Sequence, residues 1–327
     1  MSTPPRNLKS IAMHQRLDQI RLRLLQVHAI DFDADEQSLL QIRETARTLA
    51  DSDLELYAIN VRGILYTIVG RLEESYAIHE EGAQMALEVD NRERWSAAKL
   101  NHALILTFRG KYGDARALFE SLIPTLESLP DTLENVTRLY LFFTDLGSAC
   151  MDMGDSEAAI HYASRYVEDW NSQRVLLIQP QRRAEIMCKA RDVLSWAYCA
   201  RGEFADARTQ ANLLFAISTQ QSRAWYVAAG HMALLRIAIF DSAAAADPEI
   251  QWDQMSALIA QKANERDSGL WMIEELVLMR EARFCKRRDK IQWARRFAEK
   301  SLEILATLDN MQRRQIVEAF LADLPPL

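Results

Sequence analysis

The residues of this sequence that could perform chemistry are few and scattered. Six histidines occur, and no two stand three or four residues apart, so no pair could hold a metal ion from one helix face. Cys188 and Cys199, eleven residues apart on one helix face, could meet a metal, but they suit buried apolar positions better. No HExxH, GxSxG or glycine-rich phosphate-binding pattern is present. The sequence therefore predicts no catalytic residue, no metal site and no cofactor.

Two asparagines recur at nearly the same place in consecutive segments. Asn60 stands ten residues before Gly70, and Asn101 stands nine residues before Gly110. A side-chain amide donates and accepts hydrogen bonds at once, which suits the backbone amide of a bound peptide. The alternative is an ordinary solvated or helix-linking asparagine. We expect both side chains to be solvated in the unbound protein.

A basic stretch, residues 280–300, interrupts an otherwise acidic chain. Its sequence, REARFCKRRDKIQWARRFAEK, interleaves nine Lys or Arg residues with three aromatic ones. Such a surface can bind phosphates or an acidic partner. The alternative is a solvated outer face whose aromatic residues lie in the core. The candidate patch consists of Arg280, Arg283, Lys286, Arg287, Arg288, Arg295 and Arg296.

The composition predicts that these residues are carried by helices. The chain has 327 residues, 49% of them apolar, with only 10 Gly and 8 Pro. Because turns consume Gly and Pro, their scarcity favours helices joined by short connections. A net charge of −7 does not favour nucleic acid as a partner. Four cysteines without a disulfide framework and the lack of a signal peptide or membrane span predict a cytoplasmic protein.

One octapeptide is repeated along the chain. RGKYGDAR occupies residues 109–116, RGEFADAR occupies 201–208, and related copies begin at Val69 and Met153. Each has a Gly, an acidic residue soon after it and a small residue five positions on. The glycines are Gly70, Gly110, Gly154 and Gly202, with spacings of 40, 44 and 48 residues.

The repeated motif has the chemistry of a corner between two helices. A Gly just past a helix end can adopt the left-handed backbone that closes the helix. An acidic residue in the first turn of the following helix lies at the positive end of that helix's dipole. Gly63 and Gly147, seven residues before two of these corners, predict that the two helices of a hairpin approach closely. Pro124 should kink or end its helix.

These residues resemble the tetratricopeptide repeat (TPR) family. GILY at 63–66, LGSAC at 146–150 and GKYGDARALFESL at 110–122 carry the Gly, Tyr, Ala and Phe of its pattern in register. The period exceeds the 34 residues of that family, as in the long-helix TPR arrays of bacterial signalling and regulatory proteins. The resemblance implies an all-α, right-handed α-solenoid with short corners.

We expect about seven helical hairpins in a single domain over residues 1–327, closed by a C-terminal capping helix. The hairpins are predicted at 7–50, 52–88, 92–129, 132–170, 181–218, 221–265 and 268–307, with the cap at 309–323. The apolar residues of the loop at 171–180 have no explanation in this pattern.

The TPR resemblance also implies where a ligand would bind. In that family the first helix of each hairpin lines a concave groove, in which Asn often holds a peptide backbone. Trp196 could anchor a ligand or pack in the core. The implied groove residues are Tyr57, Asn60, Ile64, Asn101, Leu104, Thr144, Ser148, Lys189, Asp192 and Trp196.

The sequence thus predicts a non-enzymatic scaffold that binds a protein or peptide segment in a bacterial regulatory or signalling complex. One alternative is a receptor that senses a short peptide through the same groove. Another is an accessory protein that binds nucleic acid or an acidic partner through the 280–300 stretch. The partner and the oligomeric state are not determined by the sequence.

Overall fold

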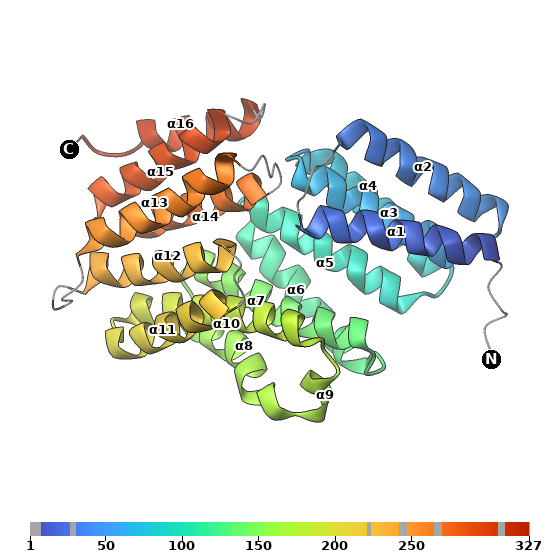
Figure 1. The fold of residues 1–327 in the computed structure, drawn as a ribbon, viewed down its shortest axis with the longest axis horizontal. Coiled ribbons are helices and arrows are strands. Elements are labelled where there is room, and N and C mark those ends of the chain that lie inside the picture. Colours follow the sequence, from blue (N-terminus) through green and yellow to red (C-terminus); the bar gives the residue numbers. More distant parts are fainter. Residues whose placement is uncertain are drawn as a thin grey trace. The chain divides into compact units, whose positions relative to one another are not determined.

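The computed structural model of the chain describes residues 8–26, 31–220, 224–241, 243, 247–264, 270–306 and 311–326. Within these ranges the chain forms sixteen α-helices and one short 3-10 helix, with no strand (Figure 1). The described chain is all-helical, which confirms the predicted fold class. The described chain falls into two compact units, residues 1–109 with 266–327 (unit 1) and residues 110–265 (unit 2).

Unit 1 contains the first five helices and the last three. Its helices are α1 (Leu8–Gln26), α2 (Phe32–Thr48), α3 (Ser52–Ile68), α4 (Leu72–Glu88), α5 (Arg92–Phe108), α14 (Leu270–Lys286), α15 (Ile291–Ala306) and α16 (Met311–Ala322).

Unit 2 contains the intervening helices. They are α6 (Tyr112–Ser128), α7 (Leu133–Met153), α8 (Ser156–Glu168), η1 (Asp169–Asn171), α9 (Gln173–Leu176), α10 (Pro180–Arg201), α11 (Phe204–Gln220), α12 (Ala224–Phe240) and α13 (Pro248–Asn264).

The division of the chain into seven hairpins with the predicted bounds stays a prediction. The single-domain organisation and the handedness stay predictions. Some predicted helix ends and part of one connection lie outside the described residues, namely 7, 27–28, 221–223, 242, 244–246, 265, 268–269, 307 and 309–310.

The four motif glycines all lie at helix ends with left-handed backbone. Their φ angles are 79° at Gly70, 74° at Gly110, 85° at Gly154 and 78° at Gly202. After Gly154 the amide of Asp155 donates to the carbonyl of Cys150 at 2.9 Å, a bond that closes the preceding helix. The sequence prediction that these residues form corners is therefore confirmed.

The corner between α14 and α15 has the same geometry without a glycine. Asp289 has a φ of 57°, and the amide of Lys290 donates to the carbonyl of Cys285 at 3.0 Å. Asp tolerates the left-handed region better than most residues because its short side chain bonds locally. This corner therefore lacks the glycine of the repeated motif, although it lies within the hairpin predicted at 268–307.

Small residues let paired helices approach closely, as predicted. A Cβ placed on Gly63 of α3 would lie 2.4 Å from the ring of His79 on α4, and Ser75 Oγ donates to the carbonyl of Gly63 at 2.7 Å. A Cβ on Gly147 would lie 3.3 Å from the carbonyl oxygen of Ala159. The Gly63 contact also explains why His79 is almost fully buried, at 1% exposure.

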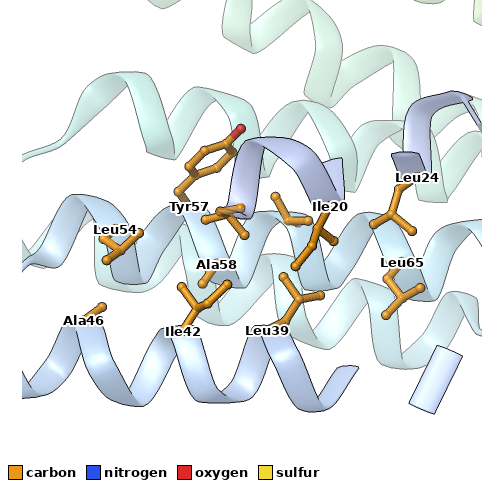
Figure 2. Packing of buried hydrophobic residues seen from close by; sticks show 11 residues of the cluster. Ile20, Leu24, Leu39, Ile42, Ala46, Leu54, Tyr57, Ala58 and Leu65 are labelled. Carbon is orange, nitrogen blue, oxygen red and sulfur yellow. The ribbon is translucent and has the colours of Figure 1, made fainter. Parts of the chain in front are cut away.

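Each unit has its own apolar core. In unit 1 the cluster in Figure 2 joins Leu17, Ile20 and Leu24 of α1 to α2 and α3. The α2 and α3 members are Leu39, Ile42, Ala46, Leu54, Tyr57, Ala58, Val61 and Leu65. In unit 2 a cluster joins α10, α11 and α12 and consists of Cys188, Cys199, Ala207, Ala211, Leu214, Ala233 and Ile237.

Two local expectations were changed by packing. The stretch at 171–180 contains a short helix, α9, and burial of Val175 and Ile178 accounts for two of its apolar residues, whereas Leu176 and Leu177 are exposed. Pro124 does not end its helix, because α6 continues to Ser128. The buried stripe of α6 runs past the proline through Leu122 and Leu126, so burial offsets the lost backbone hydrogen bond.

Candidate functional site

Asn60 and Asn101 form a direct contact between two first helices of consecutive hairpins, α3 and α5. The Asn101 side-chain nitrogen donates to Asn60 Oδ1 at 2.8 Å, and both residues are half-buried. Each side chain is therefore only partly solvated, because one hydrogen bond of each amide is made to the other asparagine. The prediction that they lie in register is confirmed by the contact.

A charged row runs beside this pair across α1, α3 and α5. Arg94 Nε on α5 donates to Asp53 Oδ1 on α3 at 2.8 Å. His14 Nε2 on α1 lies 3.5 Å from Asp53 Oδ2. One carboxylate thus joins three neighbouring helices, and Arg94 is held with only 15% of its side chain exposed.

Tyr57 forms a second row between α1 and α3. Its hydroxyl donates to Asp18 Oδ1 at 2.6 Å and accepts from Arg21 Nη1 at 3.2 Å. The Arg94 guanidinium lies 4.5 Å from the centre of its ring. Burial raises the pKa of Tyr57 to about 12, so the hydroxyl stays protonated and can donate.

We call these eight residues the polar face of unit 1. Its members are His14, Asp18, Arg21, Asp53, Tyr57, Asn60, Arg94 and Asn101. Ile64 lies one turn beyond Asn60 and Leu104 lies one turn beyond Asn101, both half-buried. Half-buried apolar side chains therefore lie next to the two asparagines.

Unit 2 has polar pairs between its own first helices. Lys189 Nζ on α10 lies 3.6 Å from Asp145 Oδ1 on α7. Arg236 on α12 donates to Asp192 Oδ1 on α10 at 3.4 Å and lies 5.4 Å from the centre of the Trp196 ring. Lys189, Asp192 and Trp196 all lie on α10, within the hairpin predicted at 181–218.

Three of the predicted groove residues are buried. The exposed fraction is 5% for Tyr57, 1% for Thr144 and 2% for Trp196. Trp196 packs beneath Arg236, so it could touch a ligand only after that arginine moved. Ser148 is half-buried on α7. The role of all ten residues as ligand contacts stays a prediction.

The basic stretch lies on α14, α15 and the corner between them, where neighbours engage its side chains. Lys286 donates to Asp323 and lies 5.2 Å from the centre of the Phe320 ring. Arg295 donates to the carbonyl of Pro325 at 3.2 Å. Arg288 and Arg296 lie over the rings of Phe284 and Trp293, and Arg280, Arg283 and Arg287 also have partners. Its binding role stays a prediction.

Sequence reasoning named Asp192 but missed Asp53, Arg94 and Arg236, the other charged residues of these pairs. Asp53 and Arg94 are 41 residues apart, the same separation as Asn60 and Asn101. Asp192 and Arg236 are 44 residues apart, which matches one of the glycine spacings. A search for opposite charges one repeat apart would have found them.

No other chemistry is evident in the part of the chain that the structure describes. It contains no group of three His, Cys, Asp or Glu side chains that could hold a metal ion. None of its helices is long and apolar enough to cross a membrane. All four cysteines are buried, and burial raises the pKa of Cys150 to about 12 and that of Cys188 to about 12, so neither thiol is a ready nucleophile.

The fold and these rows define the class as an all-helical, repeat-like protein whose first helices are joined by polar pairs. No known family model matches the sequence, and no curated protein matches it. Among solved structures, the chain is similar to the apo form of the quorum sensor NprR from B. thuringiensis. The identity is 13% and the TM-score is 0.36, over 97% of this chain and 88% of that chain.

Proposed function

We propose that this protein is a non-enzymatic binding protein that holds an extended peptide, or an extended segment of a protein, on the polar face of unit 1. The observation that carries the proposal is the hydrogen bond between Asn60 and Asn101. It leaves the Asn60 amide group to donate and the Asn101 amide oxygen to accept. The Asn60 NH2 group and the Asn101 oxygen can then pair with the C=O and N–H groups of an extended peptide.

The two asparagines therefore act as one clamp. Exchanging oxygen and nitrogen in both side chains would reverse the bond between them and again leave one donor and one acceptor. The clamp is pre-organised, because the bond between the two amides fixes both side chains before a ligand arrives. Less conformational entropy is then lost on binding.

The surrounding residues suit the same task. Asp53, Arg94 and Arg21 are held in place by partners on neighbouring helices, so they offer fixed charges to ligand side chains. Ile64 and Leu104 provide apolar area next to the clamp. The TPR-like corner motif supports a place in a bacterial regulatory or signalling complex. A short signalling peptide and a segment of a larger protein both fit this chemistry.

A direct test begins with a peptide selected from a random linear library against the purified protein. The double variant Asn60→Ala/Asn101→Ala should weaken its binding at least tenfold, since an unpaired polar group costs about 1–3 kcal/mol and tenfold is about 1.4 kcal/mol. Titration calorimetry gives the affinities. Asn212→Ala, on an exposed position of α11, is the matched control and should bind normally.

The ligand can be altered as well as the protein. Methylating one backbone nitrogen of the peptide removes a hydrogen-bond donor. At one position of the peptide, methylation should weaken binding to the parent protein. The same methylation should change the affinity for the double variant little. If every N-methylated peptide binds like the parent peptide, or if the double variant binds normally, the clamp is refuted. Acetylating the amino end and amidating the carboxyl end of the peptide then distinguishes a ligand recognised by its free ends from an internal segment, whose binding should not change.

A further inference from the structure

A buried ion pair joins two of the C-terminal helices of unit 1. Glu275 of α14 is 0% exposed, and Arg313 of α16 is 5% exposed. Arg313 Nη2 donates to both oxygens of Glu275, at 2.9 and 2.8 Å, and Nε adds a third bond at 3.1 Å. Ser301 of α15 donates to the same carboxylate at 3.2 Å. All three helices therefore meet at one carboxylate.

The same guanidinium reaches a helix far away in the sequence. Arg313 Nη1 donates to the carbonyl of Phe108 at 3.2 Å, across 205 residues of sequence. Phe108 is the last residue of α5, where carbonyl groups lack partners within the helix. A cation is favoured there because the C-terminal end of the helix dipole is negative.

The end of α5 is also part of the candidate binding site. Asn101, Leu104 and Phe108 are spaced at i, i+3 and i+7, so they share one side of that helix. A shift or rotation at Phe108 would therefore move the Asn101 amide relative to Asn60. Within unit 1, the Arg313 bond ties α14–α16 to the helix that carries half of the clamp.

We propose that Arg313 is a positioning residue for the Asn60–Asn101 clamp, and that it couples the C-terminal helices of unit 1 to ligand binding. This inference rests on the proposed function. Arginine suits the task because its planar fork binds Glu275 through Nε and Nη2 while Nη1 remains for the Phe108 carbonyl. A lysine could balance the charge of Glu275, but its single ammonium group could not reproduce that geometry.

The central variant is Arg313→Lys, which keeps a cation beside Glu275 and removes the fork. The double variant Glu275→Leu/Arg313→Met replaces the ion pair by apolar groups of similar size, so it removes the Phe108 bond without leaving a buried charge. Ile304→Val removes one buried methyl group from α15 and serves as the control for general destabilisation. Circular dichroism verifies that each variant is folded.

The first measurement needs no ligand. Spin labels on cysteines placed at Ala77 of α4 and Gln315 of α16, both exposed, report the distance between these helices, and the four native cysteines are buried. We expect a narrow distance distribution for the parent and for Ile304→Val. We expect a broader one for Arg313→Lys and for the double variant. An unchanged distribution in both latter proteins would refute the coupling of the C-terminal helices to α5.

The second measurement is the affinity for the selected peptide, below the melting temperature of every variant. We expect a loss of about tenfold in Arg313→Lys and in the double variant, and none in Ile304→Val. If the distances broaden but the affinity holds while Asn60→Ala/Asn101→Ala binds weakly, Arg313 does not position the clamp. If the asparagine variant also binds normally, the proposed function itself is wrong, and the distance measurement alone then decides the coupling.

Discussion

The imidazole of His79 should make the stability of this protein depend on pH. Its side chain is buried against Gly63, and neither ring nitrogen has a hydrogen-bond partner among the described residues. Burial, together with the nearby His102, lowers the pKa of His79 from 6.5 to about 3. A histidine that is neutral in the folded chain and protonated in the unfolded chain favours unfolding in acid.

The sign and size follow from that difference. The folded pKa is the lower one, so the stabilisation is complete above pH 6.5 and is lost as the pH falls from there toward 3. A pH of 5 lies about 1.5 units below the unfolded pKa and above the folded pKa. Protonation therefore stabilises the unfolded chain and not the folded one. At about 1.36 kcal/mol per unit, this amounts to about 2 kcal/mol.

The assay is chemical denaturation at pH 7.5, 6 and 5. We expect the parent to lose about 2 kcal/mol more than His79→Leu between the highest and lowest pH. Carboxylates titrate in both proteins, so their contributions cancel when the stability loss of His79→Leu is subtracted from that of the parent. His161→Ala, at an exposed position, is the control and should follow the parent. If the parent and His79→Leu lose equal stability on acidification, His79 does not carry a lowered pKa and the burial argument is refuted.

Further predictions concern small residues at close contacts and can be checked by thermal unfolding. Gly63→Ala should destabilise by more than about 1–3 kcal/mol, since its Cβ would lie 2.4 Å from the His79 ring. Gly113→Ala, with nothing within 4 Å, should be neutral or stabilise by up to about 1 kcal/mol, and an equal loss in both would contradict the steric argument. Ala115→Trp and Ala207→Trp, each at a 0% exposed position, should cost more than about 1–3 kcal/mol, and melting temperatures close to the parent's would show that these crossings have room.

The helical hairpins could be predicted because their signals are local. An apolar stripe ends at Gly70, Gly110, Gly154 or Gly202, and a left-handed residue at a helix end requires little beyond its own chemistry. The corner at Asp289 does not carry the motif, because Asp289 adopts the left-handed backbone conformation without being glycine. Pro124 does not end α6, because burial of the α6 stripe outweighs a local propensity.

The candidate site could be predicted only in part. Asn60 and Asn101 were found because the repeat gave their register, and register brings equivalent positions of neighbouring repeats together. Their hydrogen bond to each other was not foreseen, because it depends on the distance between α3 and α5. The burial of Trp196 beneath Arg236 likewise depends on which side of α10 faces α12.

By itself, the sequence determined the helices, their corners and the periodic placement of the asparagines, all of which depend on residues within a few turns of one another. Tertiary structure alone decided the rest. A hydrogen bond from Arg313 to the end of α5 joins residues 205 positions apart, and no pattern along the chain encodes that distance. Periodicity fixes which residues share a helix face, whereas packing fixes which faces meet. A binding site depends on both.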